Sequence, residues 1–269
     1  MFQLKSELSL ISLNARGLRD ITKRKRKNAN VIFLQETHSK TEDCNFWSKQ
    51  WGDKAYFCHG SSRSAGVAVL LKNFQGQIIS HYKDQHGHWL ILVVNFDTFN
   101  LVLINVYGYN NLSQNKFMLE DIAQNLGQIK QTYSTNNIII GGDFNLVQDN
   151  YYDKWPSKYS MSHPNITFNT FCNEQHLMDI WRHLNPGTIK SSWFSSTNKS
   201  RLDYWLVANE LLTNDIHSDI SNSSQGGSSW RLKLLDKLDK MNIQKAEGAF
   251  VRSRAKWIEE GEKKYSLFL

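Results

Sequence analysis

The chain has 269 residues, 40% of them hydrophobic and 12% aromatic, which is enough for one large α/β domain or two small ones with a sizeable core. No run approaches the roughly 18 apolar residues of a membrane span, and the first residues, MFQLKSELSL, lack the features of a secretory signal. Three widely spaced cysteines are typical of a reducing compartment. We therefore expect an intracellular protein of the nucleus or cytoplasm, without a membrane partner and monomeric.

The net charge of +7 comes from two short segments. Residues 19–27, RDITKRKRK, contain six basic side chains and one acidic side chain, and residues 230–269 contain ten basic and six acidic side chains. The rest of the chain has a net charge of −2. The basic composition therefore does not by itself indicate a broad nucleic-acid-binding surface. It leaves room for a metal-dependent site whose carboxylates make the body of the protein acidic.

Short apolar runs separated by polar turns predict a chain of strands with interspersed helices, which indicates an α/β sandwich of mixed sheets. Many of these runs are continuously hydrophobic, as expected for strands covered on both faces. Helical spacing of Phe117, Met118, Ile122, Leu126 and Ile129 predicts a helix over residues 114–133, and a second helix is expected over residues 165–177. The predicted strands cover residues 8–13, 31–35, 66–72, 77–82, 89–96, 101–107, 137–142, 192–195 and 202–208, with a hairpin between the fifth and the sixth.

The composition changes near residue 221, so we expect a domain over residues 1–221 followed by two other segments. Residues 222–229, rich in serine and glycine, are expected to form a flexible linker. Residues 230–269 are expected to form a basic helical tail, because Leu232, Leu235, Leu238 and Met241 recur at helical spacing. Such a tail is either a solvated charged helix or a segment that binds a partner.

Polar residues follow or begin several of the predicted strands, and rigid strands can direct such side chains into one crevice. A carboxylate at the end of an apolar strand must be paired, bound to metal or exposed. This set suits hydrolysis of a phosphodiester. Oxygen ligands suit Mg²⁺, an aspartate can take a proton from water, and a tyrosine can donate to a phosphate oxygen. The residues in these roles are Glu36 and Asn14 as metal ligands, Asp143 as the base, Asn145 beside it, and Tyr107 as the donor.

Six segments occur in the order seen in the exonuclease–endonuclease–phosphatase superfamily, namely SLNARGL, IFLQETHS, SRSAGVAVLLK, NVYGYNN, IIIGGDFN and SRLDYWLV. Together they most resemble the apurinic-type endonuclease domain of LINE-type (non-LTR) retrotransposons. The string SRAKWIEEGEKKYSLFL also resembles the segment that joins this domain to the reverse transcriptase in such elements.

The resemblance implies a four-layer α/β sandwich of two packed mixed sheets flanked by helices, of the deoxyribonuclease I-like type. It implies a Mg²⁺-dependent or Mn²⁺-dependent enzyme that nicks one DNA strand, with element RNA and the reverse transcriptase of a parent polyprotein as further partners. The active-site residues implied by motif position are Asn14, Glu36, Tyr107, Asp143, Asn145 and Asp203, with Asn110, Ser192 and Arg201 as substrate contacts.

The chain departs from the family pattern in two places. The family's site closes with an Asp-His dipeptide on a strand after the SRLD motif, and no such dipeptide occurs in this chain. Ser218-Asp219 matches half of it and His217 is the nearest substitute, although a surface histidine is the more ordinary interpretation of His217. We therefore expect the closing strands to be missing. The segment between Leu18 and Val31 contains one large apolar residue, so part of the first helix is also expected to be missing and KRKRK to be exposed.

Two hypotheses follow. The first is a magnesium-dependent DNA endonuclease of a non-LTR retrotransposon, impaired by loss of the Asp-His motif. The second is a non-catalytic remnant of such an element, which binds nucleic acid through its basic segments. A zinc site at His86 and His88 is not predicted, because no cysteine or acidic ligand stands at metal spacing.

Overall fold

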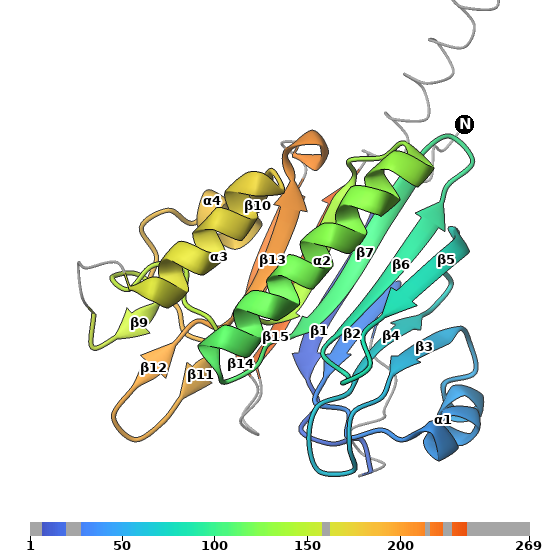
Figure 1. The fold of residues 1–269 in the computed structure, drawn as a ribbon, viewed down its shortest axis with the longest axis horizontal. Helices are drawn as coiled ribbons and strands as arrows, with labels where there is room; N and C mark the ends of the chain where they lie inside the picture. The colour runs from blue at the N-terminus through green and yellow to red at the C-terminus, as the bar shows by residue number, and fades with distance from the viewer. Residues whose placement is uncertain (1–6, 20–27, 158–161, 213–215, 223–227, 236–269) are drawn as a thin grey trace, which may run out of the picture.

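A computed structural model describes residues 7–19, 28–157, 162–212, 216–222 and 228–235. The described residues form two six-stranded sheets packed face to face and a small three-stranded sheet (Figure 1). The first sheet has the order β14 (Ile216–Asn222), β15 (Ser228–Leu235), β1 (Glu7–Asn14), β2 (Val31–Gln35), β4 (Val67–Leu71) and β3 (Ala55–Cys58). The second has the order β10 (Leu177–Asp179), β13 (Asp203–Ala208), β8 (Ile138–Asp143), β7 (Asn100–Tyr107), β6 (Trp89–Asn95) and β5 (Gln77–Lys83).

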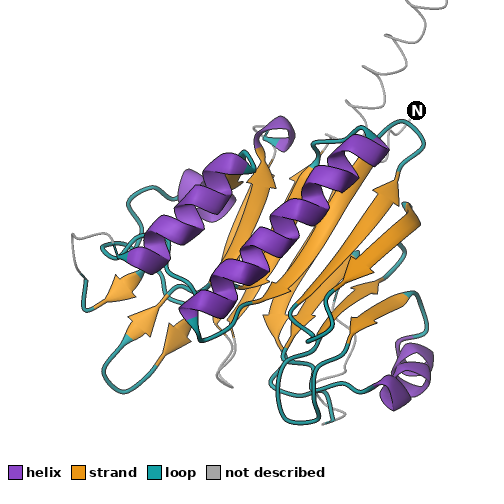
Figure 2. Cartoon of the chain, in the orientation of Figure 1, coloured by secondary structure: helices purple, strands orange, loops and turns teal. Residues whose placement is uncertain are grey.

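Helices cover the outer faces of both sheets, so the predicted four-layer sandwich is confirmed (Figure 2). On the second sheet lie α2 (Leu112–Tyr133) and α3 (His163–Glu174), and on the first lies α1 (Cys44–Trp51) after the 3₁₀ turn η2 (Thr41–Asp43). The short helix α4 (Ile180–Leu184) follows β10, and η3 (Asn209–Leu211) follows β13. The small sheet consists of β11 (Trp193–Phe194), β12 (Lys199–Ser200) and β9 (Lys154–Trp155).

Both large sheets are mixed. Strand β1 runs parallel to β2 and β7 runs parallel to β8, while the other pairs in these sheets are antiparallel. Every residue of β8 is buried, because β8 packs on the other sheet through Ile139 and on α2 and α3 through Ile138 and Ile140. This double coverage explains the three consecutive isoleucines.

The long helix α2 begins at its N-cap Asn111, whose side chain accepts a hydrogen bond from the backbone of Gln114. Its predicted buried stripe is confirmed for Met118, Ile122, Leu126 and Ile129. Phe117 was wrongly placed in that stripe, because its side chain is 69% exposed and Leu119 takes the inward position.

The prediction that the closing strands are missing is wrong. Strand β15 pairs with β1 on one side and with β14 on the other, so β1 is not an edge strand. The predicted linker and helical tail are therefore wrong for Ser228–Leu235. The strand buries Leu232 and Leu234 and exposes Arg231, a two-residue alternation. Residues 223–227 and 236–269 lie outside the described residues.

The connection between β1 and β2 is described only at its two ends. Leu18 and Ala29 are buried there, and Trp47 and Trp51 of α1 help to cover the same face of the sheet. Residues 20–27, with the KRKRK run that was predicted to be exposed, lie outside the described residues. In the described part of the chain, no helix is long and apolar enough to cross a membrane.

Candidate active site

Five strands place polar side chains at one edge of the two packed sheets. Parallel pairing aligns Asn14 with Gln35 in the first sheet and Tyr107 with Asp143 in the second. Antiparallel pairing places Asp203, the first residue of β13, directly opposite Asp143. Parallel strands that end together put their last side chains at the same edge. In Figure 1 this is the lower edge, to which the arrowhead of β1 points.

Two side-chain hydrogen bonds join the sheets at this edge. Asn14 Nδ2 donates to Asp143 Oδ2 over 3.3 Å, and the Tyr107 hydroxyl donates to Glu36 Oε1 over 2.5 Å. Asn145 completes the cluster, because its backbone N–H donates to Asp143 Oδ1 over 3.1 Å and its Nδ2 donates to the carbonyl of Gly108 over 2.7 Å. The structure thus brings together all six residues implied by motif position.

The glycines before Asp143 allow close contacts that a larger residue would prevent. A Cβ on Gly142, whose φ is 145°, would lie 1.9 Å from the carbonyl oxygen of Val106. A Cβ on Gly141 would lie 2.2 Å from the ring of Trp205. Only glycine fits such approaches. The GGD sequence therefore holds Asp143 close to both neighbouring strands.

The loops after the strands carry non-glycine residues in the left-handed region. Arg16, Glu36, His38 and Asn145 have φ values of 46°, 49°, 52° and 50°. Such conformations are unfavourable for residues with a Cβ and concentrate at functional sites.

The carboxylate of Asp143 is buried and hydrogen-bonded. Asp143 is 9% exposed. Burial raises the pKa of Asp143 to about 6, against the opposing effect of its hydrogen bonds from Asn145 and Asn14, and the charge of Glu36 raises it further. Such a group titrates near neutral pH, as a general base for hydrolysis requires.

The pKa of Asp203 is also raised well above its ordinary value, first by burial and then by the charge of Asp143. Ser192 acts against this shift by a hydrogen bond to the Asp203 carboxylate. The hydroxyl of Ser192 also accepts the backbone N–H groups of Leu202 and Asp203, at 3.0 and 3.3 Å. Ser192 therefore joins the small sheet to the cluster.

Burial raises the pKa of Tyr107 far above its ordinary value, and the bond to Glu36 adds to this effect. The phenol therefore remains a hydrogen-bond donor at any physiological pH.

A second polar bridge lies behind the cluster and was missed in the sequence. Gln35 and Asn105 are fully buried in facing sheets, and Gln35 Nε2 donates to Asn105 Oδ1 over 2.6 Å. Asn105 Nδ2 in turn donates to the carbonyls of Leu34 and Ala68. The signal was a polar residue at the end of the apolar run VIFLQ and another inside LVLINVY.

The predicted substrate role of Arg201 is wrong. Its guanidinium group is fully buried and binds Asp153 at 2.8 Å and Asp179 at 2.6 Å, above the ring of Tyr204. Arg201 is therefore part of the protein interior. Asn110 lies exposed in the loop between β7 and α2.

No histidine among the described residues donates to the carboxylate of Asp203. His217, the nearest substitute in the sequence, is exposed on β14 and pairs with Lys233. The register places Ser229 beside Leu13, so β15 begins near Asn14 and His217 lies toward the opposite end of the sheet. The connection between β14 and β15, residues 223–227, has the sequence SSQGG and contains no histidine.

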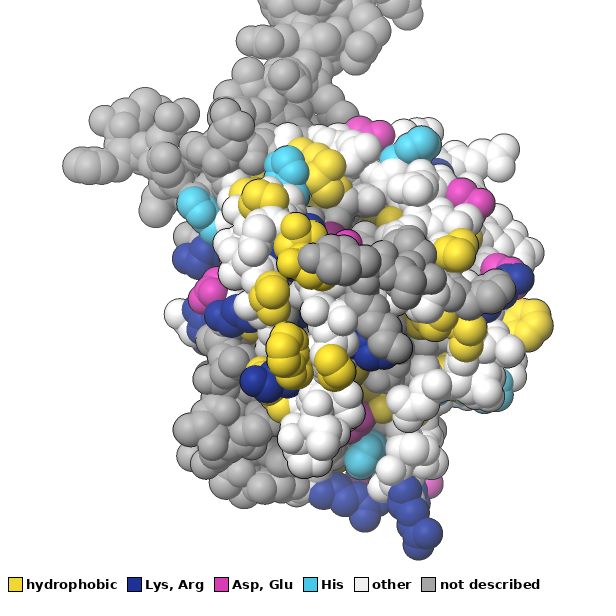
Figure 3. All heavy atoms as spheres, turned by 90° about the vertical axis from the view of Figure 1, so that its left-hand side faces the viewer, with side chains coloured by type: hydrophobic (Ala, Val, Ile, Leu, Met, Phe, Trp, Pro, Cys, Tyr) yellow, Lys and Arg dark blue, Asp and Glu magenta, His cyan; other side chains and the backbone are white. Residues whose placement is uncertain are grey.

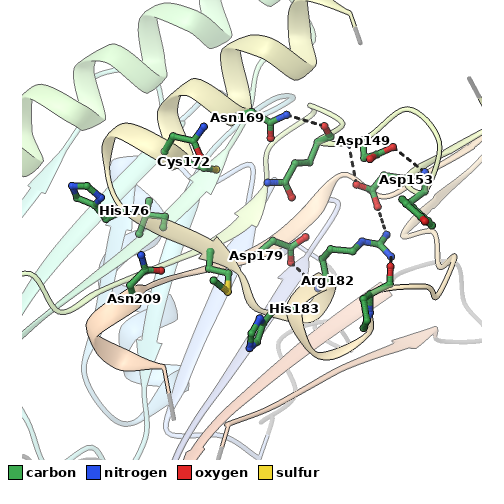
Figure 4. A pocket seen from close by; sticks show the side chains of 15 residues that line it. Asp149, Asp153, Asn169, Cys172, His176, Asp179, Arg182, His183 and Asn209 are labelled. Atoms are coloured by element: carbon green, nitrogen blue, oxygen red, sulfur yellow. Dashed lines mark hydrogen bonds and ion pairs between the residues drawn. The ribbon is translucent and has the colours of Figure 1, made fainter. Parts of the chain in front are cut away.

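A cavity of about 870 Å³ is bordered by residues of α3, β10 and α4 (Figure 4). Figure 4 shows Asp153 and Arg182 pointing toward each other, and their side chains are 2.6 Å apart. The Asp179 carboxylate forms an ion pair with the Arg201 guanidinium. The cavity therefore lacks free carboxylates from these two residues, and none of the six clustered residues lines it.

The chemistry of the cluster fits a hard divalent cation. Among the described residues, no three His, Cys, Asp or Glu side chains are grouped as ligands. Mg²⁺ needs only one or two protein carboxylates, because phosphate and water supply its remaining ligands. The cluster offers oxygen donors, and the charge of Glu36 adds to the effect of burial, the larger cause, in raising the pKa of Asp143.

Comparisons with known proteins agree with this geometry. A Xenopus laevis protein, the transposon TX1 uncharacterized 149 kDa protein, is 27% identical over 218 residues, which are 77% of this chain and 16% of that protein. The chain therefore spans a small part of this relative. The 3′-5′ exonuclease NExo from Neisseria meningitidis shares the fold with a TM-score of 0.63 and 13% identity, over 84% of this chain and 98% of that one.

The endonuclease domain of TRAS1, a telomere-specific non-LTR retrotransposon, shares the fold with a TM-score of 0.59 and 12% identity, over 85% of this chain and 98% of that one. The resemblance to retrotransposon endonuclease domains is thus confirmed. A model of the Endonuclease/Exonuclease/phosphatase family matches residues 11–224. The chain therefore belongs to the Endonuclease/Exonuclease/phosphatase family.

Proposed function

We propose that the chain is a Mg²⁺-dependent DNA endonuclease of the non-LTR retrotransposon type, with a rate lowered by the missing Asp-His motif. The observation that carries this proposal is the environment of Asp143. Its carboxylate is buried, titrates near pH 6 and is oriented by Asn14 and Asn145. A phosphodiesterase needs such a base beside its metal ligand.

Each residue of the cluster has a role in this reaction. Asp143 takes a proton from the attacking water, and Asn145 orients Asp143. The single Tyr107 O–H donates to Glu36 in the free protein, and in the reaction it would donate to a phosphate oxygen instead, as charge develops there. Glu36 and Asn14 would hold Mg²⁺ or Mn²⁺, which supplies Lewis acidity and neutralises negative charge.

The small sheet next to the cluster supports DNA as the partner. Its register places Phe194, Lys199 and Trp155 side by side in one row. All three are exposed, Phe194 by 51% and Trp155 by 58%. The face drawn in Figure 3, which is the left-hand side of Figure 1, carries hydrophobic side chains next to lysines and arginines. Aromatic rings with neighbouring cations are suited to bases and phosphates.

The proposal is tested by measuring how fast the protein converts supercoiled plasmid to the nicked circle. Nicking is expected with Mg²⁺ and is expected to disappear with a chelator or in Glu36→Gln. Exposed Glu120→Gln, on α2, is the matched control and should nick like the unchanged chain. Nicking that survives in Glu36→Gln would contradict the proposed metal ligand.

The second candidate function is a nucleic-acid-binding remnant without catalysis. It is favoured by Asp203, to which no histidine donates among the described residues. Binding without nicking, with an affinity that falls steeply as salt increases, would support this function, because contacts to phosphate release counterions. The basic segments to which this binding was assigned lie mainly outside the described residues.

A further inference from the structure

His88 binds the backbone of Tyr107, the residue that carries the proposed phosphate donor, whereas Glu36 binds its hydroxyl. His88 lies directly before β6, in a turn organised by Asp84. Asp84 Oδ1 accepts the backbone N–H groups of Gly87, His88 and Trp89, at 3.1, 2.9 and 3.2 Å. The bonds to Asp84 therefore fix the backbone of His88 independently of its contacts with Tyr107.

Both main-chain polar groups of Tyr107 bind His88. The Tyr107 N–H donates to the His88 carbonyl over 2.7 Å. The Tyr107 carbonyl lies 2.5 Å from Nδ1 of the His88 ring. Since a carbonyl can only accept, Nδ1 must carry the proton in this contact. His88 thus binds Tyr107 twice, with its own backbone carbonyl as acceptor and its ring N–H as donor.

The ring of His88 also packs parallel to two tyrosine rings. Its centroid lies 3.5 Å from that of Tyr109 at 15° and 5.6 Å from that of Tyr107 at 11°. The side chain is buried, with 8% exposure, and burial lowers the pKa of His88. The ring is therefore neutral at physiological pH, with one N–H that can be assigned to Nδ1.

We propose that His88 is a positioning residue that holds Tyr107 so that its hydroxyl meets Glu36. The proposal rests on the proposed function only for its catalytic consequence, because the positioning itself is a property of the free protein. A histidine that merely fills the core would need no bond to the Tyr107 carbonyl. Misplacement of a reacting group by about 1 Å can lower a rate by about 10², so a fixed Tyr107 matters for the chemistry.

The first test is made on the unchanged protein by NMR of its histidine ring nitrogens. The proposal predicts that His88 carries its proton on Nδ1 and that this proton exchanges slowly. A His88 ring protonated on Nε2 alone would overturn the proposal, because it could not donate to the Tyr107 carbonyl. This result does not depend on activity, so it is independent of whether the chain nicks DNA.

The second test follows the Cζ resonance of Tyr107 in protein labelled with ¹³C-tyrosine, assigned with Tyr107→Phe. His88→Phe keeps an aromatic ring and removes the donor, so it is expected to shift the Tyr107 signal. His88→Asn replaces the donor and is expected to leave the signal closer to its original position. His86→Phe, on the exposed neighbour in the same turn, is the matched control and should leave the signal unchanged. An unchanged Tyr107 signal in folded His88→Phe would make His88 a core residue only and overturn the proposal.

The catalytic consequence is measured by nicking kinetics. His88→Phe is expected to lower kcat by about tenfold with little change in KM, because it misplaces a group that acts in the transition state. Combining it with Tyr107→Phe should add no further loss, since both changes remove the same hydroxyl from its position. Fully additive losses would show that His88 does not act through Tyr107.

Discussion

Tyr107 at the end of β7 donates a hydrogen bond to Glu36, which follows β2, and this bond joins the two sheets at the site. Neither partner is near the other in sequence, and each lies at the end of a buried strand. The bond gives Tyr107 a fixed direction and leaves the second carboxylate oxygen of Glu36 as a candidate metal ligand. The geometry of the site therefore depends on how the two sheets pack.

The buried carboxyl pair should make the protein more stable in acid than in base. A carboxyl group whose pKa is raised in the folded state contributes stability that is present below its unfolded pKa and is lost as the pH rises through its folded pKa. For Asp143 this window runs from 3.8 to about 6, and the pKa of Asp203 is raised as well. Asp203→Asn is expected to raise the melting temperature at pH 8.

The gain should be present at pH 8, where the Asp203 carboxyl would have to be charged in a buried site, and should shrink as the pH falls and the carboxyl becomes neutral. Calorimetry across the pH range measures it, and the gain should disappear below about pH 4. The exposed Asp97→Asn, in the turn after β6, is the control and should show no such pH dependence. A gain from Asp203→Asn that is equal at all pH values would show that its cause is not the charge.

Removing one partner of the Arg201 ion pairs should destabilise the fold strongly. Arg201→Met leaves Asp153 with only Arg182 and leaves Asp179 without its ion pair, both carboxylates being almost fully buried. The free energy of unfolding in urea should fall by about 3 to 5 kcal/mol. Lys116→Met, in an exposed pair with Glu120, should change it by less than about 0.5 kcal/mol. Equal effects of the two substitutions would refute the structural role of Arg201.

Strand β15 can be tested at two adjacent positions. Leu232 is fully buried, whereas Arg231 is exposed. Leu232→Ala should lower the free energy of unfolding by about 2 to 5 kcal/mol, and Arg231→Ala should change it by less than about 0.5 kcal/mol. A negligible effect of Leu232→Ala would contradict the pairing of β15 with β1 and would favour the separate tail expected from the sequence.

This strand also shows where the sequence was insufficient. Leu232 and Leu235 fit helical spacing, while Leu232 and Leu234 fit a strand, and a short apolar run does not distinguish the two. Pairing with β1 makes these residues a strand, and this pairing is a long-range contact that local sequence patterns do not contain. The polar residues at strand ends were predictable, because each interrupts an apolar run. That these residues lie close together across the two sheets could be expected only from the family resemblance, and it depends on how the sheets pack.

The buried positions of His88 and Arg201 were not predictable for the same reason. His88 was weighed only as a metal ligand, and its contact with Tyr107 depends on the pairing of β6 with β7. Arg201 belongs to the SRLD motif, which gives no information on the two aspartates that bind it from elsewhere in the chain.

Restoring the missing dipeptide should restore catalytic rate. Gln225→Asp with Gly226→His introduces an Asp-His dipeptide into the sequence between Asn222, which ends β14, and Ser228, which begins β15. A transition-state donor contributes about 10² to 10³ in rate, so nicking should increase by up to this factor. Adding Asp203→Asn should remove the gain, because Asp203 is the partner that would orient the histidine. A gain that survives this third change would contradict that role of Asp203.

The most direct test of the proposed base is the nicking rate of Asp143→Asn with Mg²⁺, compared with Asp97→Asn on the exposed turn after β6. Asparagine keeps the shape of the side chain and cannot take the proton from water. The account predicts that Asp143→Asn loses nicking by about 10² or more while its affinity for DNA is retained, and that Asp97→Asn nicks like the unchanged chain. Equal nicking by all three proteins would contradict the assignment of Asp143 as the base.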